Sequence, residues 1–153
     1  MLSLVSGGCF TTPTAPPRPS CKTAIFTDTS VTAPVEPKLS RGVRRFRRVE
    51  VNFRPIFHGN SAPTIGSSAK SIDLNLFPDL CLRVVREQVA DVGGKVEWIG
   101  HVKDVLNSRV VLVFDGQLMV GTITMDRDTY RISYLGDGIH AVTDIDQAAF
   151  PRD

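Results

Sequence analysis

Five stretches of alternating apolar and polar residues, punctuated by turn signals, constrain the fold of this chain most. Alternation with a period of two places one face of each strand in a core and leaves the other against solvent. Gly93-Gly94, Asp115-Gly116 and Gly136-Asp137-Gly138 supply residues that tolerate a positive φ in tight turns. The pattern predicts an antiparallel β-meander whose strands cover Val96 to Val102, Val110 to Phe114, Leu118 to Met125, Thr129 to Leu135 and Ile139 to Ile145.

Three earlier segments extend this pattern. Arg48 to Phe53 and Ile72 to Leu76 both alternate, whereas Leu80 to Val89 fits either a strand or a helix. The β-branched content of the last segment and the Gly93-Gly94 turn after it favour a strand. We therefore predict a mainly β domain of about seven antiparallel strands, folded as a sandwich or a partly open barrel.

The residues before this domain have a different composition. Residues 11–40 are rich in Thr, Pro and Ser, and proline resists both helix and sheet. The basic run from Arg41 to Arg48 could dock on phosphate, but blocks of like charge are usually solvated and flexible. We predict a disordered leader over residues 1–46 and a β domain over 47–153, and we do not expect nucleic-acid binding.

The cysteines and the amino terminus give weak signals. Cys9, Cys21 and Cys81 lack CxxC spacing, so no disulfide framework is indicated; a Cys9–Cys21 bridge remains an alternative. Cys81 lies between Leu80 and Leu82, which predicts a buried structural thiol. The start has no positive region and too few apolar residues for a secretory signal, and no run approaches the roughly 20 apolar residues of a membrane helix.

No set of side chains is spaced for catalysis, and we predict no catalytic, cofactor-binding or metal-binding residues. Among His58, His101 and His140, no two lie four residues apart as on a zinc-binding helix. His101 and His140 could share a metal with Asp137 or Asp144, but unpaired surface histidines are the commoner arrangement. Asp137-Gly138 suits a turn. Trp98, Tyr130 and Tyr134 could form a binding patch, although aromatic residues at alternating positions usually pack in the core.

Several landmarks occur in order between residues 48 and 151. They are the strand Arg48 to Phe53, Leu74-Asn75-Leu76-Phe77-Pro78-Asp79, Trp98-Ile99-Gly100-His101-Val102, Tyr130-Arg131-Ile132, Leu135-Gly136-Asp137-Gly138-Ile139-His140-Ala141-Val142 and Ile145-Asp146-Gln147-Ala148-Ala149-Phe150-Pro151. This arrangement resembles the propeptide-like region that precedes the catalytic domain of bacterial secreted zinc metallopeptidases of the reprolysin (adamalysin-like) group.

The resemblance implies a function without catalysis. The His-Glu-x-x-His helix of that family is absent from this sequence. We therefore expect a propeptide-like module, as a truncated or free-standing copy, that chaperones or masks a reprolysin-type metallopeptidase domain in a secreted or periplasmic setting. Cys81 sits in an apolar strand rather than on a loop that could present its thiolate to zinc. The alternative is an independent β-sheet binding module, with nucleic acid held by the basic leader.

Overall fold

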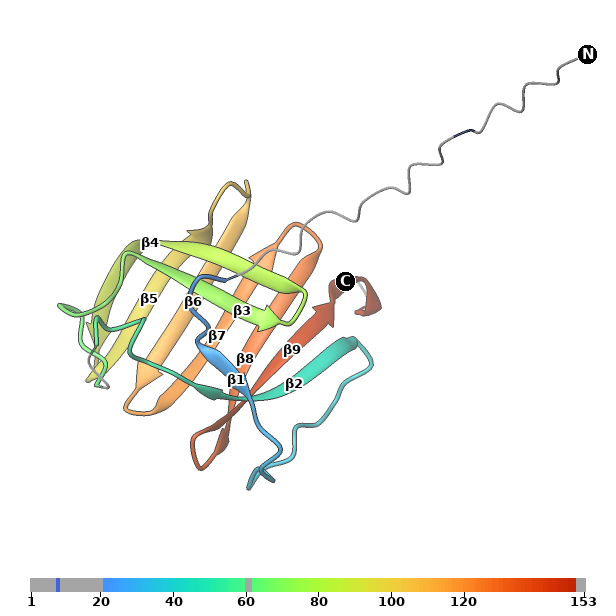
Figure 1. Ribbon diagram of the computed structural model, residues 1–153, viewed down its shortest axis with the longest axis horizontal. Helices are drawn as coiled ribbons and strands as arrows, with labels where there is room; N and C mark the ends of the chain where they lie inside the picture. Colours follow the sequence, from blue (N-terminus) through green and yellow to red (C-terminus); the bar gives the residue numbers. More distant parts are fainter. Residues whose placement is uncertain (1–7, 9–20, 60–61, 151–153) are drawn as a thin grey trace, which may run out of the picture.

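The computed structural model describes residue 8 and residues 21–59 and 62–150, which form nine strands and one short 3-10 helix (Figure 1). The remainder of residues 1–20 in the predicted leader lies outside the described residues. The elements are β1 (Phe26–Asp28), β2 (Val43–Val51), β3 (Ser71–Phe77), β4 (Leu80–Val92), β5 (Lys95–Val102), β6 (Ser108–Asp115), β7 (Leu118–Met125), β8 (Asp128–Gly136), β9 (Ile139–Asp146) and η1 (Gln147–Ala149).

All nine strands belong to one antiparallel sheet, which curls into a nearly closed barrel. The order across the sheet is β1-β2-β9-β8-β7-β6-β5-β4-β3. Each strand from β3 to β8 pairs with the next along the chain, which confirms the predicted meander, and β9 also pairs with β2. The mainly β fold is confirmed, in the form of a barrel. Within the described residues, no helix is long and apolar enough to cross a membrane.

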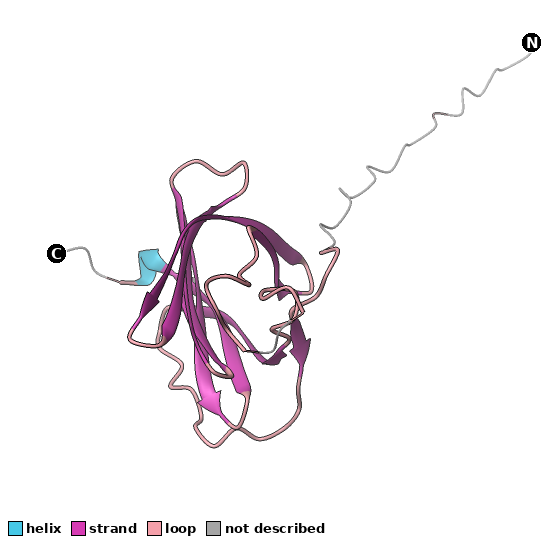
Figure 2. Cartoon of the chain, turned by 90° about the vertical axis from the view of Figure 1, so that its left-hand side faces the viewer, coloured by secondary structure: helices cyan, strands magenta, loops and turns pink. Residues whose placement is uncertain are grey.

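Inward-facing side chains and one loop fill the barrel. Trp98, Leu112 and Phe114 are fully buried, as alternation along β5 and β6 requires. The loop after β2 adds Phe53, Ile56 and Phe57, and the ring of Phe57 meets that of Phe114 edge-on with centroids 4.9 Å apart. Figure 2 shows loop segments lying within the curve of the sheet. The prediction that Trp98 is a core residue is confirmed, and its indole N–H donates to the carbonyl of Ala69 at 3.1 Å.

Side chains, rather than a backbone ladder, join the two ends of the sheet. The Asn75 amide of β3 accepts from the backbone N–H groups of Ile25 and Phe26 at 2.9 Å and donates to the Phe26 carbonyl at 2.7 Å. The guanidinium of Arg47 donates to the carbonyls of Asn75 and Leu76 at 2.7 and 3.1 Å. We call this contact between β1 and β3 the seam. It closes the barrel because one amide and one guanidinium satisfy backbone groups that would otherwise lack partners.

A disulfide lies beside the seam and corrects one prediction. Cys81, at the start of β4, is bonded to Cys21, five residues before β1, with 5.5 Å between their Cα atoms. Cys81 is therefore not a free buried thiol. Cys21 is consequently unavailable to Cys9, which lies outside the described residues.

The ordered domain begins earlier than predicted. β1 and the first four residues of β2 fall inside the predicted leader, residues 1–46. Between these strands, Ala33 packs against Leu135 and Ile139, and the N–H of Val35 donates to the Leu135 carbonyl at 3.2 Å. The segment 21–46 therefore supplies one edge of the barrel and a cover over part of its outer surface.

Candidate functional site: an apolar outer face

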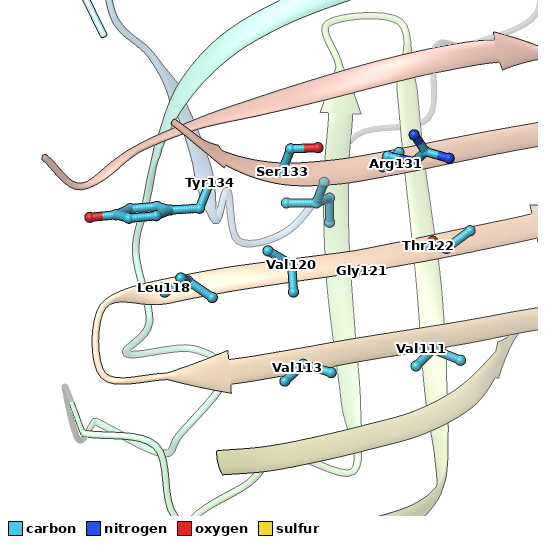
Figure 3. A pocket seen from close by; sticks show the side chains of 10 residues that line it. Val111, Val113, Leu118, Val120, Gly121, Thr122, Arg131, Ser133 and Tyr134 are labelled. Atoms are coloured by element: carbon cyan, nitrogen blue, oxygen red, sulfur yellow. The ribbon is translucent and has the colours of Figure 1, made fainter. Parts of the chain in front are cut away.

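The outer surface of β6, β7 and β8 carries a shallow apolar depression of about 580 Å³ (Figure 3). The apolar side chains that β6 and β7 contribute point away from the core, in alternation with fully buried residues such as Leu112 and Met119. They are half-buried, and within the described part of the chain only β6, β7 and β8 line the depression. We call these side chains the valine face, which consists of Val111, Val113, Leu118 and Val120, and Tyr134 lines one end of the depression (Figure 3).

Polar groups border the valine face but do not form a catalytic set. Thr122, Arg131 and Ser133 complete its edge. Activation of a hydroxyl requires a base within hydrogen-bond reach, and none of the ten lining residues is a histidine or a carboxylate. An open apolar surface with a polar border is suited to covering another protein surface rather than enclosing a small molecule.

The structure separates the two histidines that were considered as metal ligands. His101 lies on β5 and His140 on β9, with three strands between them in the sheet. The Nδ1 atom of His101 lies 2.7 Å from a carboxylate oxygen of Glu87. Among the residues that the structure describes, no group of three or more His, Cys, Asp or Glu side chains is placed to hold a metal ion.

His140 instead fastens the β8–β9 turn to β7. Its Nε2 atom accepts from the backbone N–H of Met119 at 3.0 Å, so Nδ1 carries the proton and donates to the Gly138 carbonyl at 3.1 Å. The ring is 1% exposed, and burial lowers its pKa below the ordinary 6.5. Asp137 and Gly138 adopt φ values of 51° and 76°, which confirms the predicted turn between the last two strands.

Tyr130 and Tyr134 have different positions. Tyr130 is 5% exposed and belongs to the core, as expected of an aromatic residue at an alternating strand position. The ring of Tyr134 lies 5.0 Å from that of His140, and its hydroxyl accepts from the N–H of Gly138 at 3.2 Å. Tyr134 therefore connects the valine face to the turn that His140 fastens.

Four arginines of the basic run are paired with acidic groups, which corrects their interpretation as solvated. Asp144 is 5% exposed and binds Arg44 at 2.8 Å and Arg45 at 3.1 Å, so it is not a metal ligand but the centre of an ion-pair cluster. Arg44 also binds Asp128 at 2.8 Å, and the hydrogen bonds to the two carboxylates raise its pKa.

The next two arginines of the run are also engaged. Arg47 pairs with Asp28 and Arg48 with Glu36. These pairs remove most of the free positive charge on which nucleic-acid binding by this segment was based.

The valine face was not among the sites predicted from the sequence, although a signal for it was present. In an alternating strand with one solvated face, outward positions are normally polar. Val111, Val113 and Val120 occupy outward positions of β6 and β7, so both faces of these strands are apolar. Strands that are apolar on both faces in a single-layer barrel indicate a surface that another molecule can cover.

Comparison with known proteins finds no family model, no curated protein and no solved structure that matches this chain.

Proposed function

We propose that this domain is a non-catalytic, propeptide-like binding module that masks or assists the folding of a reprolysin-type metallopeptidase domain. The observation that carries the proposal is the valine face, which lines an open apolar depression of about 580 Å³ without a histidine or carboxylate among its lining residues. The choice of partner comes from the sequence resemblance between residues 48 and 151.

Several of the residues that make up the resemblance belong to the framework of the barrel. Trp98 fills the core, and the Gly136 to His140 turn is fastened to β7 through Met119. Phe150 lies against Gly42, and a Cβ atom at position 42 would come within 2.7 Å of the Phe150 ring. Residues with these roles preserve a scaffold, and a scaffold of this kind can present different outer faces to different partners.

A binding module of this kind acts by burying part of its surface against its partner. A specific interface between proteins covers roughly 800 Å² on each partner, with an apolar centre and a polar border. The valine face supplies the apolar centre, and Thr122, Ser133 and Arg131 supply part of the border. Covering the matching surface of a peptidase domain would shield it from other contacts while that domain folds.

The disulfide is consistent with this setting. Disulfides persist in the oxidising environments of exported proteins and are rare where thiols are kept reduced. The Cys21–Cys81 bond therefore supports the secreted or periplasmic location that the resemblance implies.

The test is binding to a reprolysin-type catalytic domain from the same source, measured by calorimetry and by inhibition of peptide hydrolysis. We expect saturable binding that Val120→Glu weakens strongly, because a carboxylate would be desolvated in the interface. Val92→Glu, at an exposed valine in the β4–β5 hairpin, is the matched control. Absence of binding, or equal binding by the Val120→Glu protein, would refute the proposal. Tight binding of one zinc ion by the purified chain would also count against it.

A further inference from the structure

Two opposite charges flank the valine face, and neither is paired with a group that the structure describes. Glu97 is half-buried on the outer side of β5, and Arg131 is exposed on the outer side of β8. Among the described residues, neither side chain has an ion pair or a side-chain hydrogen bond. Arg44, Arg45, Arg47, Arg48 and Arg83, in contrast, all bind carboxylates.

The strand register fixes where these two charges lie relative to the apolar centre. Glu97 lies opposite Val113, which lies opposite Val120. In the next row of outward residues, Val111 lies opposite Thr122, which lies opposite Arg131. The two charges therefore stand at diagonal corners of the patch. They are three strands apart, about 14 Å at the usual spacing between strands.

We propose that two copies of this chain pair face to face through the valine face about a two-fold axis. Such an interface is isologous, so a contact from one residue to another occurs twice. The axis lies in the plane of contact and crosses the line from Glu97 to Arg131 at its midpoint and at a right angle. Each Glu97 then faces the partner's Arg131.

The apolar residues agree with the same axis. This two-fold axis passes through the middle of the patch, close to Val111 and Val120. Each of these two side chains therefore meets its own counterpart in the second copy. Ion pairs at both ends and valines along the axis reproduce the apolar centre and charged border of a specific interface. The two opposite charges, at positions that the two-fold axis exchanges, also select this alignment. Other alignments leave like charges facing each other or leave charges unpaired.

This inference goes beyond the proposed function and does not depend on it. Self-association is a property of the isolated chain and requires no peptidase. If the peptidase proposal is also correct, the two partners compete for one face, and adding the peptidase domain dissociates the dimer.

The experiment is sedimentation equilibrium of the full chain and of charge-reversed variants. We expect a reversible dimer. Glu97→Arg and Arg131→Glu should each weaken it by roughly a hundredfold, since two like-charge contacts replace two ion pairs. Arg54→Glu, at an exposed residue on the loop after β2 that does not line the depression, is the control and should not change the dissociation constant.

Complementation makes the test specific. In a mixture of the Glu97→Arg and Arg131→Glu proteins, both cross-interface pairs are again attractive, so a heterodimer should form although each variant alone is monomeric. The double variant should also dimerise. Far-UV circular dichroism confirms that each variant is folded. A monomeric wild type up to its solubility limit, or failure of the mixture to associate, would overturn the proposal.

Discussion

Removal of the Cys21–Cys81 bond tests how the barrel is closed. The two cysteines are 60 residues apart, so the bond restricts a loop of that length in the unfolded chain. The loop-entropy relation gives about 4 kcal/mol of stabilisation for a loop of this size. The bond joins the segment before β1 to β4, so its loss also releases the amino-terminal side of the seam. We expect Cys81→Ser to lower the free energy of unfolding by about 4 kcal/mol.

The assay is urea unfolding of the oxidised protein, the reduced protein and the Cys81→Ser variant, followed by tryptophan fluorescence. Trp98 is the only tryptophan and lies fully buried in the core, so its emission reports the global transition. Cys9→Ser is the matched control and should unfold like the parent. A decrease below about 1 kcal/mol in both reduced and variant proteins would show that loop entropy does not stabilise this barrel.

Three further predictions concern the core, the buried histidine and the amino-terminal segment. Trp98→Ala should cost roughly 3 to 5 kcal/mol in urea unfolding, because it removes a large buried side chain; an unchanged midpoint would contradict the core assignment. His140 is neutral in the fold and its pKa is lowered, so its stabilising contribution is complete above about pH 6.5 and is lost as the pH falls through the folded-state pKa. Unfolding measured from pH 8 to 5 should therefore be less pH-dependent in His140→Gln, and an identical slope would contradict this role. A chain starting at residue 21 should melt like the parent, whereas one starting at Arg47 should not fold, as circular dichroism would report; a folded Arg47 fragment would show that β1 and the start of β2 are dispensable.

The strands could be predicted from the sequence because alternation is a local property. β7 was predicted with its observed bounds, and β5, β6, β8 and β9 within two residues at each end. β1 could not be predicted, since three residues are too few to show a period. Its stability comes from pairing with β2 and from the Asn75 amide, which is 49 residues away.

Charges and cysteines were misinterpreted because their partners are distant in the sequence. Arg44 and Asp144 are 100 residues apart, and a run of arginines without a visible acidic partner is indistinguishable from a solvated tail. The pairing of Cys21 with Cys81 depends in the same way on closure of the barrel. The valine face could have been predicted, since outward valines on two adjacent strands are visible in the alternation itself.

The pairing of β2 with β9 has a consequence for biosynthesis. A ribosome delivers β2 early and β9 only after six further strands, so until β9 has emerged β2 can pair with the three-residue β1 alone and is not joined to the meander. Until then Arg44 and Arg45 lack Asp144, and β8 keeps an open edge that can pair with other chains. An interrupted chain therefore remains open to proteases and chaperones, and only a chain synthesised through β9 can close the barrel. Closure of the barrel therefore occurs only after translation has passed β9.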